Sequence, residues 1–317
     1  MDIVNLYKNA LRIHFIGIGG ISMSALAKYL FLQKKLISGS DKCKNAQFLQ
    51  LCNMGITVHK GHKKENVMGK DLVVYSSSIS ESNEELVMAR KLKIPVVKRS
   101  ELLGAIASEY DKVIAVSGCH GKTTATAMLT NVFVNAKCSP TMFLGGEDVN
   151  YSNFLLGDSD TVILEACEYK KNFLDIKPTI SVILNIDNDH MDSYKNIKDL
   201  VKTFGEFSNK SLKIVNADDR YAKQLIDDFA ITYAIKSDAL YTAKNVRKNS
   251  DGGYSFDVYK LNKCKLSVNL HSIGKHNIYN ALVSIIVADL YDLDKELVKK
   301  SLENFKSVKR RNEYIGE

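Results

Sequence analysis

The sequence predicts an α/β protein of two domains, each built on a mainly parallel sheet. Short apolar segments rich in branched residues alternate with helical patterns along the chain, which is typical of parallel sheets covered by helices. Two of these segments, residues 11–16 and 113–116, run directly into glycine-rich turns. The length of 317 residues also exceeds what one hydrophobic core usually supports, so two domains are expected.

The first glycine-rich turn follows the expected strand 11–16 and precedes a helix with apolar residues at core spacing. Its pattern is G-x-G-x-x-S, with Ser22 in place of the last glycine, and its glycines are Gly17, Gly19 and Gly20. This is a dinucleotide-type turn of the Rossmann-like fold. A second strand ends near Ile37, and Ser40 and Asp41 follow where such folds place a ribose-binding acid. These residues alone leave a nicotinamide cofactor possible.

The same alternation continues to residue 107. The remaining elements expected in this first domain are helices at 45–53, 83–92 and 100–107 and strands at 56–58, 71–75 and 95–97. Ser77 and Ser78 follow the strand at 71–75, and polar residues at that end of a strand fit the crevice where open α/β sheets bind ligands. A plain serine turn is the alternative. The break at 108–112 predicts domains at residues 1–108 and 109–307.

The second glycine-rich turn, at residues 117–124, reads S-G-C-H-G-K-T-T and lies between the strand 113–116 and a helix expected at 125–135. Glycines let the backbone point its N–H groups at an anion, and the dipole of the following helix adds to the attraction for that anion. Lys122 supplies a charge for the outer phosphates and Thr123 a hydroxyl for Mg²⁺. The pattern therefore predicts a P-loop ATPase-type domain, although its spacing is shorter than the common one.

Two further strand ends are expected beside this loop. The strand 161–165 ends in Glu165, and the strand 180–184 is followed by a polar stretch that contains His190. The carboxyl ends of parallel strands meet at one edge of a sheet, so both side chains are expected to face the phosphates. An acid there is the usual way to hold Mg²⁺. A helix cap and a loop histidine are the plainer alternatives.

The sequence of the rest of the second domain predicts helices and a small antiparallel extension of the sheet. A helix at 197–207 and a strand at 213–216 precede alternating segments at 240–247, 254–259 and 265–270. An apolar helix then opens with Asn277 and Asn280 on one face, where carboxamides can pair with an adenine edge. For Asn277, an N-terminal cap is the alternative. A last helix runs to Phe305.

Composition narrows the class of protein. The net charge of +8 comes from scattered lysines, which favours an anionic small substrate over nucleic acid. The six cysteines show no C-x-x-C pairing, as expected of reduced thiols in the cytoplasm. No apolar run approaches the length that spans a bilayer, so no membrane association is expected. Self-association stays open.

Seven motifs in this order resemble those of the Mur ligases. They are I-H-F-I-G-I-G-G-x-x-M-S-A-L-A at 13–27, S-G-S-D at 38–41, S-G-x-H-G-K-T-T at 117–124, E-A-x-E at 165–168, N-I-x-x-D-H-M-D at 185–192, G-x-H-N-x-x-N-A at 274–281 and V-K-R-R at 308–311. The histidine at 120 and D-H-M-D at 189–192 favour the branch that adds L-alanine. The ligase that recycles murein tripeptide shares most of these motifs and stays open.

The resemblance implies an ATP- and Mg²⁺-dependent ligase that phosphorylates the carboxylate of UDP-N-acetylmuramate, after which the amine of L-alanine attacks the acyl phosphate. This replaces the nicotinamide interpretation. The implied catalytic residues are Lys122, Glu165 and His190, and the metal ligands are Thr123, Glu165 and His190. The implied ATP contacts are Gly118, Cys119, His120, Gly121, Lys122, Thr123, Thr124, Asn277, Asn280 and Arg310. The implied UDP-sugar contacts are Gly17, Gly19, Gly20, Ser40, Asp41, Ser77 and Ser78.

Three residues depart from the family pattern: Ser22 and Asn312 replace a glycine and a phenylalanine, and Cys119 replaces the usual threonine. Family members carry a third domain that binds the amino acid, and residues 308–317 correspond to the start of the linker to it. We therefore expect residues 1–317 alone not to ligate L-alanine. A non-catalytic protein that binds a UDP-sugar or ATP is the alternative.

Overall fold

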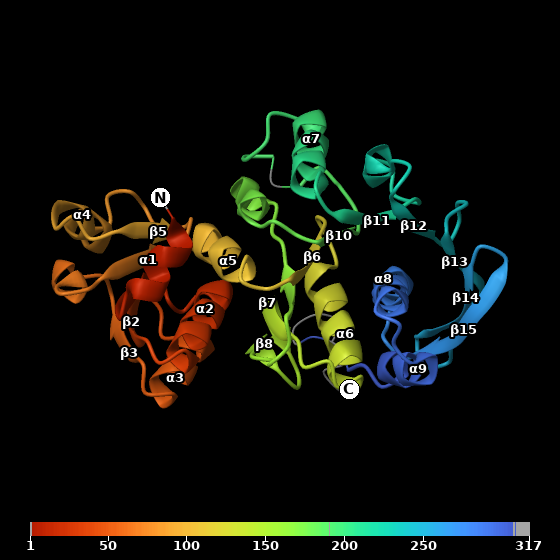
Figure 1. The fold of residues 1–317 in the computed structure, drawn as a ribbon, viewed down its shortest axis with the longest axis horizontal. Helices are drawn as coiled ribbons and strands as arrows, with labels where there is room; N and C mark the ends of the chain where they lie inside the picture. The colour runs from red at the N-terminus through yellow and green to blue at the C-terminus, as the bar shows by residue number, and fades with distance from the viewer. Residues whose placement is uncertain (1, 190, 307, 309–317) are drawn as a thin grey trace. The chain divides into compact units, whose positions relative to one another are not determined.

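The computed structural model describes residues 2–189, 191–306 and 308. The chain folds into two compact units, residues 1–109 and 110–317 (Figure 1). Within the described residues, no helix combines the length and the apolar character that crossing a bilayer requires.

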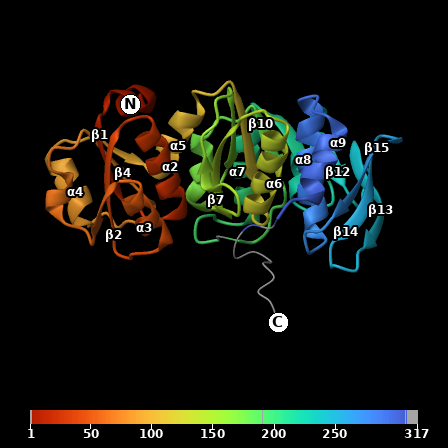
Figure 2. The same cartoon turned by 90° about the horizontal axis from the view of Figure 1, so that it is seen from below.

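The first unit is a doubly wound domain around a parallel five-stranded sheet in the order β3-β2-β1-β4-β5. The strand order reverses between β1 and β4, and right-handed connections therefore place successive helices on opposite faces. Figures 1 and 2 show α2 and α3 on one side of the sheet and α4 on the other. The elements are α1 (Ile3–Asn9), β1 (Arg12–Ile16), α2 (Ile21–Leu32), β2 (Leu36–Asp41), α3 (Ala46–Asn53), β3 (Thr57–Lys60), η1 (Lys64–Val67), β4 (Leu72–Tyr75), α4 (Glu84–Lys91), β5 (Val96–Lys98) and α5 (Arg99–Ala107).

The second unit is built on a ten-stranded sheet in the order β15-β14-β13-β12-β11-β10-β6-β9-β7-β8. Pairings from β13 through β7 are parallel, whereas β13-β14-β15 and β7-β8 are antiparallel. The strands are β6 (Lys112–Ser117), β7 (Thr141–Asp148), β8 (Ser152–Leu155), β9 (Thr161–Glu165), β10 (Ile180–Ile183), β11 (Leu212–Asn216), β12 (Ile231–Ala234), β13 (Tyr241–Lys248), β14 (Tyr254–Lys260) and β15 (Lys263–Leu270). The fold class expected from the sequence, including the antiparallel extension, is confirmed.

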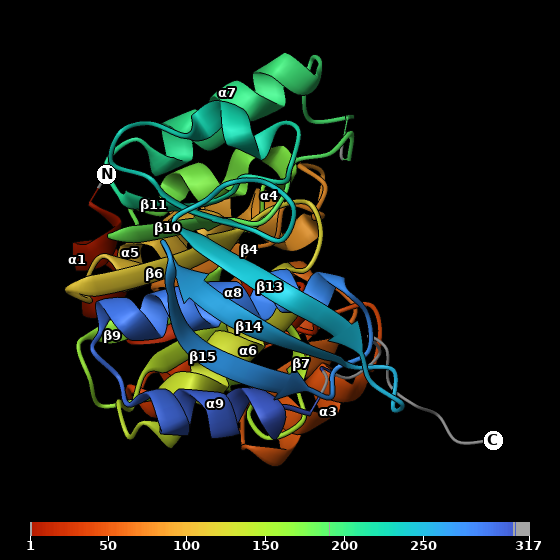
Figure 3. The same ribbon diagram turned by 90° about the vertical axis from the view of Figure 1, so that its right-hand side faces the viewer.

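Helices cover both faces of this sheet. Figures 1 and 3 show α6, α8 and α9 on one side and α7 on the other. The helices are α6 (Lys122–Asn135), η2 (Tyr169–Asp175), α7 (Ile197–Ser208), η3 (Ala222–Leu225), α8 (His276–Leu290) and α9 (Lys295–Glu303). The core between α6, α8 and the central strands contains Val116, Met128, Val132, Ile278 and Leu282, each without exposed surface. This packing fixes the N-terminal ends of α6 and α8 beside each other.

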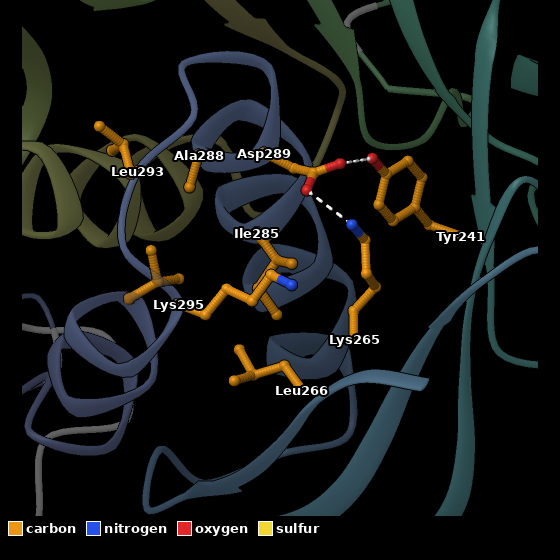
Figure 4. Close-up of a pocket in the computed structure, with 9 residues that line it drawn as sticks. Tyr241, Lys265, Leu266, Ile285, Ala288, Asp289, Leu293 and Lys295 are labelled. Atoms are coloured by element: carbon orange, nitrogen blue, oxygen red, sulfur yellow. Dashed lines mark hydrogen bonds and ion pairs between the residues drawn. The ribbon is translucent and has the colours of Figure 1, made fainter. Parts of the chain in front are cut away.

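An ionic cluster joins α8 to the antiparallel strands. Asp289 accepts hydrogen bonds from the Tyr241 hydroxyl and from Lys260 at 2.8 Å, and Lys265 lies 3.2 Å from its other oxygen (Figure 4). The pocket beside this cluster has a volume of about 20 Å³, room for about one water molecule. The cluster therefore holds the antiparallel strands β13–β15 against α8. The pocket beside it is too small for a substrate.

Candidate active site

The loop after β6 has the backbone geometry of a phosphate-binding turn. Gly118 has φ = 140° and Gly121 has φ = 84°, conformations that residues with a Cβ rarely adopt. A Cβ on Gly118 would lie 3.0 Å from the Leu184 Cβ and 3.1 Å from the Asn185 nitrogen. The 14-residue helix α6 begins at Lys122, and no side chain among the described residues caps its N-terminus. Its first N–H groups and its dipole therefore suit an anion.

Asn185, which follows β10, holds the loop in shape. Its side-chain oxygen accepts from the His120 N–H at 2.8 Å, and its side-chain nitrogen donates to the His120 carbonyl at 2.9 Å. The Asn185 carbonyl accepts from the Cys119 N–H at 3.1 Å. The Cys119 thiol makes a further contact, because its sulfur accepts a hydrogen bond from the Asp187 N–H at 3.2 Å. The sequence did not single out Asn185, although it begins the N-I-x-x-D-H-M-D motif.

Lys122 is buried in an ion pair with Glu168. Its ammonium lies 2.9 Å from one Glu168 oxygen and donates to the other at 3.1 Å, while Glu168 has no exposed surface. Burial alone would lower the pKa of Lys122, but the charge of Glu168, and then that of Glu165, outweighs burial and raises it. Lys122 is therefore held charged at the loop. Glu168 is the last residue of the E-A-x-E motif at 165–168, and the sequence did not predict a role for it.

Thr123 and Glu165 meet at the first turn of α6. The Thr123 hydroxyl donates to the Glu165 carboxylate at 2.9 Å, and the Gly145 N–H donates to the same oxygen at 2.9 Å. A hydroxyl and a carboxylate at a phosphate loop are the oxygen ligands that Mg²⁺ prefers. His190, the third predicted ligand, lies outside the described residues. In the part of the chain that is described, no cluster of three or more His, Cys, Asp or Glu side chains is placed to hold a metal ion.

The two asparagines of α8 lie beside the phosphate loop. Asn280 is next to Gly121, because a Cβ on that glycine would lie 3.4 Å from the Asn280 side-chain oxygen. Asn280 donates to the Asn277 side chain at 2.9 Å, and Asn277 donates to the Ile273 carbonyl at 2.8 Å. Both are buried, as is Thr124. The adenine contact of Asn277 and Asn280 remains a prediction, and Arg310 lies outside the described residues.

In the first unit, the glycine turn after β1 is tied to the end of β2. The Gly19 N–H donates to the Asp41 carboxylate at 2.9 Å, and a Cβ on Gly19 would lie 2.9 Å from that oxygen. The Ser40 carbonyl accepts from the N–H of Gly17 at 2.8 Å. Gly20 is the N-cap residue of α2 and, as a glycine, has no side chain that could cap the helix. The turn therefore presents a helix N-terminus at the point where the strand order reverses, which is where such sheets bind ligands.

Ser77 and Ser78 follow β4 at the same reversal point. Ser78 is exposed and Ser77 is half-buried. The hydroxyls of Ser76 and Ser78 lie 3.0 Å apart. Their position fits the predicted UDP-sugar contacts, which stay predictions.

Ser40 lies in a buried polar cluster that the sequence did not predict. Its hydroxyl donates to Glu85 at 2.5 Å and lies 2.9 Å from the His62 Nδ1. The His14 ring lies 3.6 Å from Glu85, and the side chains of His14 and Glu85 have no exposed surface. Burial opposes the charge of Glu85, but His14, Ser40 and Asn66 around it lower its pKa to about 2. The cluster fastens the end of β2 to α4.

Strand β6 lies between parallel neighbours and ends in a glycine loop, and Lys122 and Thr123 open the next helix, which is the arrangement of the P-loop class of proteins. Residues 116–288 match the family model described as the Mur ligase middle domain, and residues 12–111 match the one described as the Mur ligase family, catalytic domain. The chain belongs to the Mur ligase family.

Individual relatives agree with this assignment. The chain is 39% identical to UDP-N-acetylmuramate–L-alanine ligase of Clostridium beijerinckii over 313 residues, which are 96% of this chain and 68% of the relative. The structure resembles that of UDP-N-acetylmuramate-alanine ligase from Thermotoga maritima, with a TM-score of 0.88, 31% identity, and coverage of 95% of this chain and 70% of that one. It also resembles UDP-N-acetylmuramate:L-alanyl-γ-D-glutamyl-meso-diaminopimelate ligase from Neisseria meningitidis, with a TM-score of 0.85, 25% identity, and coverage of 94% and 99%.

Proposed function

We propose that this chain carries the UDP-sugar and ATP sites of an ATP-dependent ligase that joins L-alanine to UDP-N-acetylmuramate, in the synthesis of peptidoglycan precursors in the cytoplasm. Two kinds of relative differ in their similarity to the chain. In the structural comparison, the identity is 31% to the UDP-N-acetylmuramate-alanine ligase from Thermotoga maritima but 25% to the ligase from Neisseria meningitidis that is named for a tripeptide. This difference favours L-alanine as the amine.

The second unit would bind ATP at the loop 117–124. Its backbone is preformed by Asn185, and Lys122 supplies a held positive charge for the β- and γ-phosphates. Thr123 and Glu165 would hold Mg²⁺, which, when bound, neutralises charge on the transferring phosphoryl group. Lys122 acts by position and charge, because phosphoryl transfer needs little covalent chemistry from the protein. The observation that carries this proposal is the preformed loop with Lys122, Thr123 and Glu165 converging on it.

The first unit would hold the uridine diphosphate of the sugar substrate. The N-terminus of α2 and the N–H groups of the turn Gly17–Gly20 suit a diphosphate. Asp41 stands at the end of β2, the position that suits a ribose hydroxyl. Ser40, Ser77 and Ser78 complete the proposed contacts. The carboxylate of the bound sugar acid would be phosphorylated, and the amine of L-alanine would then displace phosphate to form the amide.

The first test is calorimetry of Mg²⁺-ATP binding to the wild type and to Lys122→Ala, with Lys202→Ala on the exposed face of α7 as the matched control. We expect Lys122→Ala to lose about 2 to 4 kcal/mol of binding free energy and the control to lose none. Equal affinity of all three proteins would contradict the ATP site.

The second test concerns the reaction. A fusion of residues 1–317 to the remaining third of an L-alanine ligase is incubated with ATP, UDP-N-acetylmuramate and either L-alanine or the murein tripeptide, and products are identified by mass spectrometry. We expect ligation of L-alanine by the fusion and none by residues 1–317 alone. Ligation of the tripeptide in preference to L-alanine would assign the chain to the recycling reaction instead.

A further inference from the structure

Glu168 has no role in the function proposed above, yet it contacts the side chain on which nucleotide binding depends. The Lys122 ammonium donates to the carbonyls of Gly118 at 2.5 Å and Cys119 at 3.2 Å, and to Glu168 at 3.1 Å. An ammonium group carries three N–H donors. These three partners therefore use its full hydrogen-bonding capacity.

A phosphate oxygen can reach Lys122 only if one of these partners gives way. The two carbonyls belong to the loop. The loop is held by Asn185, which accepts from the N–H groups of Cys119 and His120 and donates to the His120 carbonyl. Glu168 is the one negatively charged member of the three. Exchange of its carboxylate for a phosphate replaces one anion with another, so Lys122 keeps a counter-charge throughout.

The backbone at Glu168 is fixed, so the exchange needs movement of the side chain alone. The Tyr194 hydroxyl donates to the Glu168 carbonyl, and both residues are buried. The Glu168 side chain forms an ion pair with Lys122, in which the ammonium nitrogen lies 2.9 Å from a carboxylate oxygen. A carboxylate displaced from Lys122 would remain close to the phosphates and repel them.

We propose that Glu168 occupies on Lys122 the place of a phosphate oxygen when no nucleotide is bound, and that it competes with the β- and γ-phosphates for the ammonium group. The inference rests on the ATP site proposed above. Glu168 is a positioning residue in this scheme. It keeps Lys122 charged and folded onto the loop before ATP arrives, and it returns to Lys122 as ADP leaves, which speeds product release.

The test is the substitution Glu168→Gln, which keeps the shape and the hydrogen bond to Lys122 but removes the competing charge. Glu206→Gln, an exposed charge on α7, is the matched control. Calorimetry with ATP, ADP and AMP in EDTA separates the effect on the phosphates from any effect of a metal. For Glu168→Gln we expect about tenfold tighter binding of ATP and ADP, and AMP binding changed by less than about twofold. Release of a fluorescent ADP analogue, measured by stopped flow, should slow by a similar factor.

Each outcome bears on a different part of the scheme. Absence of ATP binding by the wild type would overturn the proposed function and this inference together. Binding by the wild type with equal or weaker binding by Glu168→Gln would overturn the inference alone. An equal gain for AMP would also overturn it, because a general loosening of the site does not depend on the number of phosphates.

Circular dichroism and the thermal midpoint establish that the variant is folded. Should Glu168→Gln fail to fold, Glu168→Asp takes its place, because it keeps the charge but shortens the side chain by one methylene and weakens its hold on Lys122. We then expect about threefold tighter ATP binding, and no gain would overturn the inference.

Discussion

The buried Glu85 makes the stability of the first unit depend on pH in a way that can be measured. Its folded-state pKa of about 2 lies below the ordinary value of 4.5, so the carboxylate contributes stability above pH 4.5 that is lost as the pH falls toward 2. A difference of about 2.5 pKa units corresponds to about 3 kcal/mol at neutral pH. Integrating the linkage relation, about 2 kcal/mol of this should disappear between pH 6 and pH 3.

The perturbation is Glu85→Gln, which resembles the protonated acid at every pH. Its destabilisation relative to the wild type should therefore be about 3 kcal/mol at pH 6 and smaller by about 2 kcal/mol at pH 3. His14 is coupled to this carboxylate, because burial lowers the pKa of His14 and Glu85 opposes that lowering. The share of stability that comes from His14 is lost as the pH falls below 6.5.

Urea unfolding at several pH values measures the difference. The chain has no tryptophan, so Leu49→Trp, at an exposed position of α3, gives a fluorescence signal specific to the first unit. Glu84→Gln, the exposed neighbour on α4, is the control and should follow the wild type. A difference between Glu85→Gln and wild type that stays constant from pH 6 to pH 3 would refute the linkage and the ionised state of Glu85.

Three further predictions concern the phosphate loop. Gly118→Ala should destabilise the protein by about 1 to 3 kcal/mol, measured by urea unfolding, because φ is 140° and the added Cβ meets Leu184; an unchanged midpoint would contradict the loop geometry. Asn185→Ala should weaken ATP binding more than it lowers the thermal midpoint, since it removes two hydrogen bonds to His120; calorimetry and thermal unfolding compare the two losses. Cys119 should resist alkylation by iodoacetamide at pH 8 while exposed Cys43 reacts, because burial raises the pKa of Cys119 to about 12; peptide mass spectrometry that finds both labelled equally would oppose this.

The main elements could be predicted because their patterns are local. The strand that ends at Ser117 and the apolar faces of α6 and α8 are visible in any short window of the sequence. The expected start of α6 at residue 125 was wrong by three residues, since the helix begins at Lys122. The β-branched Thr123 and Thr124 have low helix propensity, and the glycine turn before them obscures the boundary.

Other elements could not be predicted because their signals are weak or depend on distant residues. The pair β7 and β8 escaped notice, since Gly145 and Gly146 interrupt the strand pattern of β7. A Cβ on Gly145 would lie 2.7 Å from a carboxylate oxygen of Glu165, so the close approach to a residue 20 positions away requires glycine. The cluster of Glu85 and His62 likewise joins segments that are 23 residues apart in the chain. No local pattern indicates either contact.

The order of strands explains why the site is complete only in the folded sheet. β6, which leads into the phosphate loop, lies between β10 and β9. Asn185 follows β10 and holds the loop by hydrogen bonds on the β10 side. Glu165 is the last residue of β9, and Glu168, three residues later, forms the ion pair with Lys122 on the β9 side. Because the three strands are parallel, their carboxyl ends reach the same edge of the sheet. Asn185 and the two acids are therefore positioned by different strands, and we expect Asn185→Ala to leave the ion pair between Lys122 and Glu168 in place.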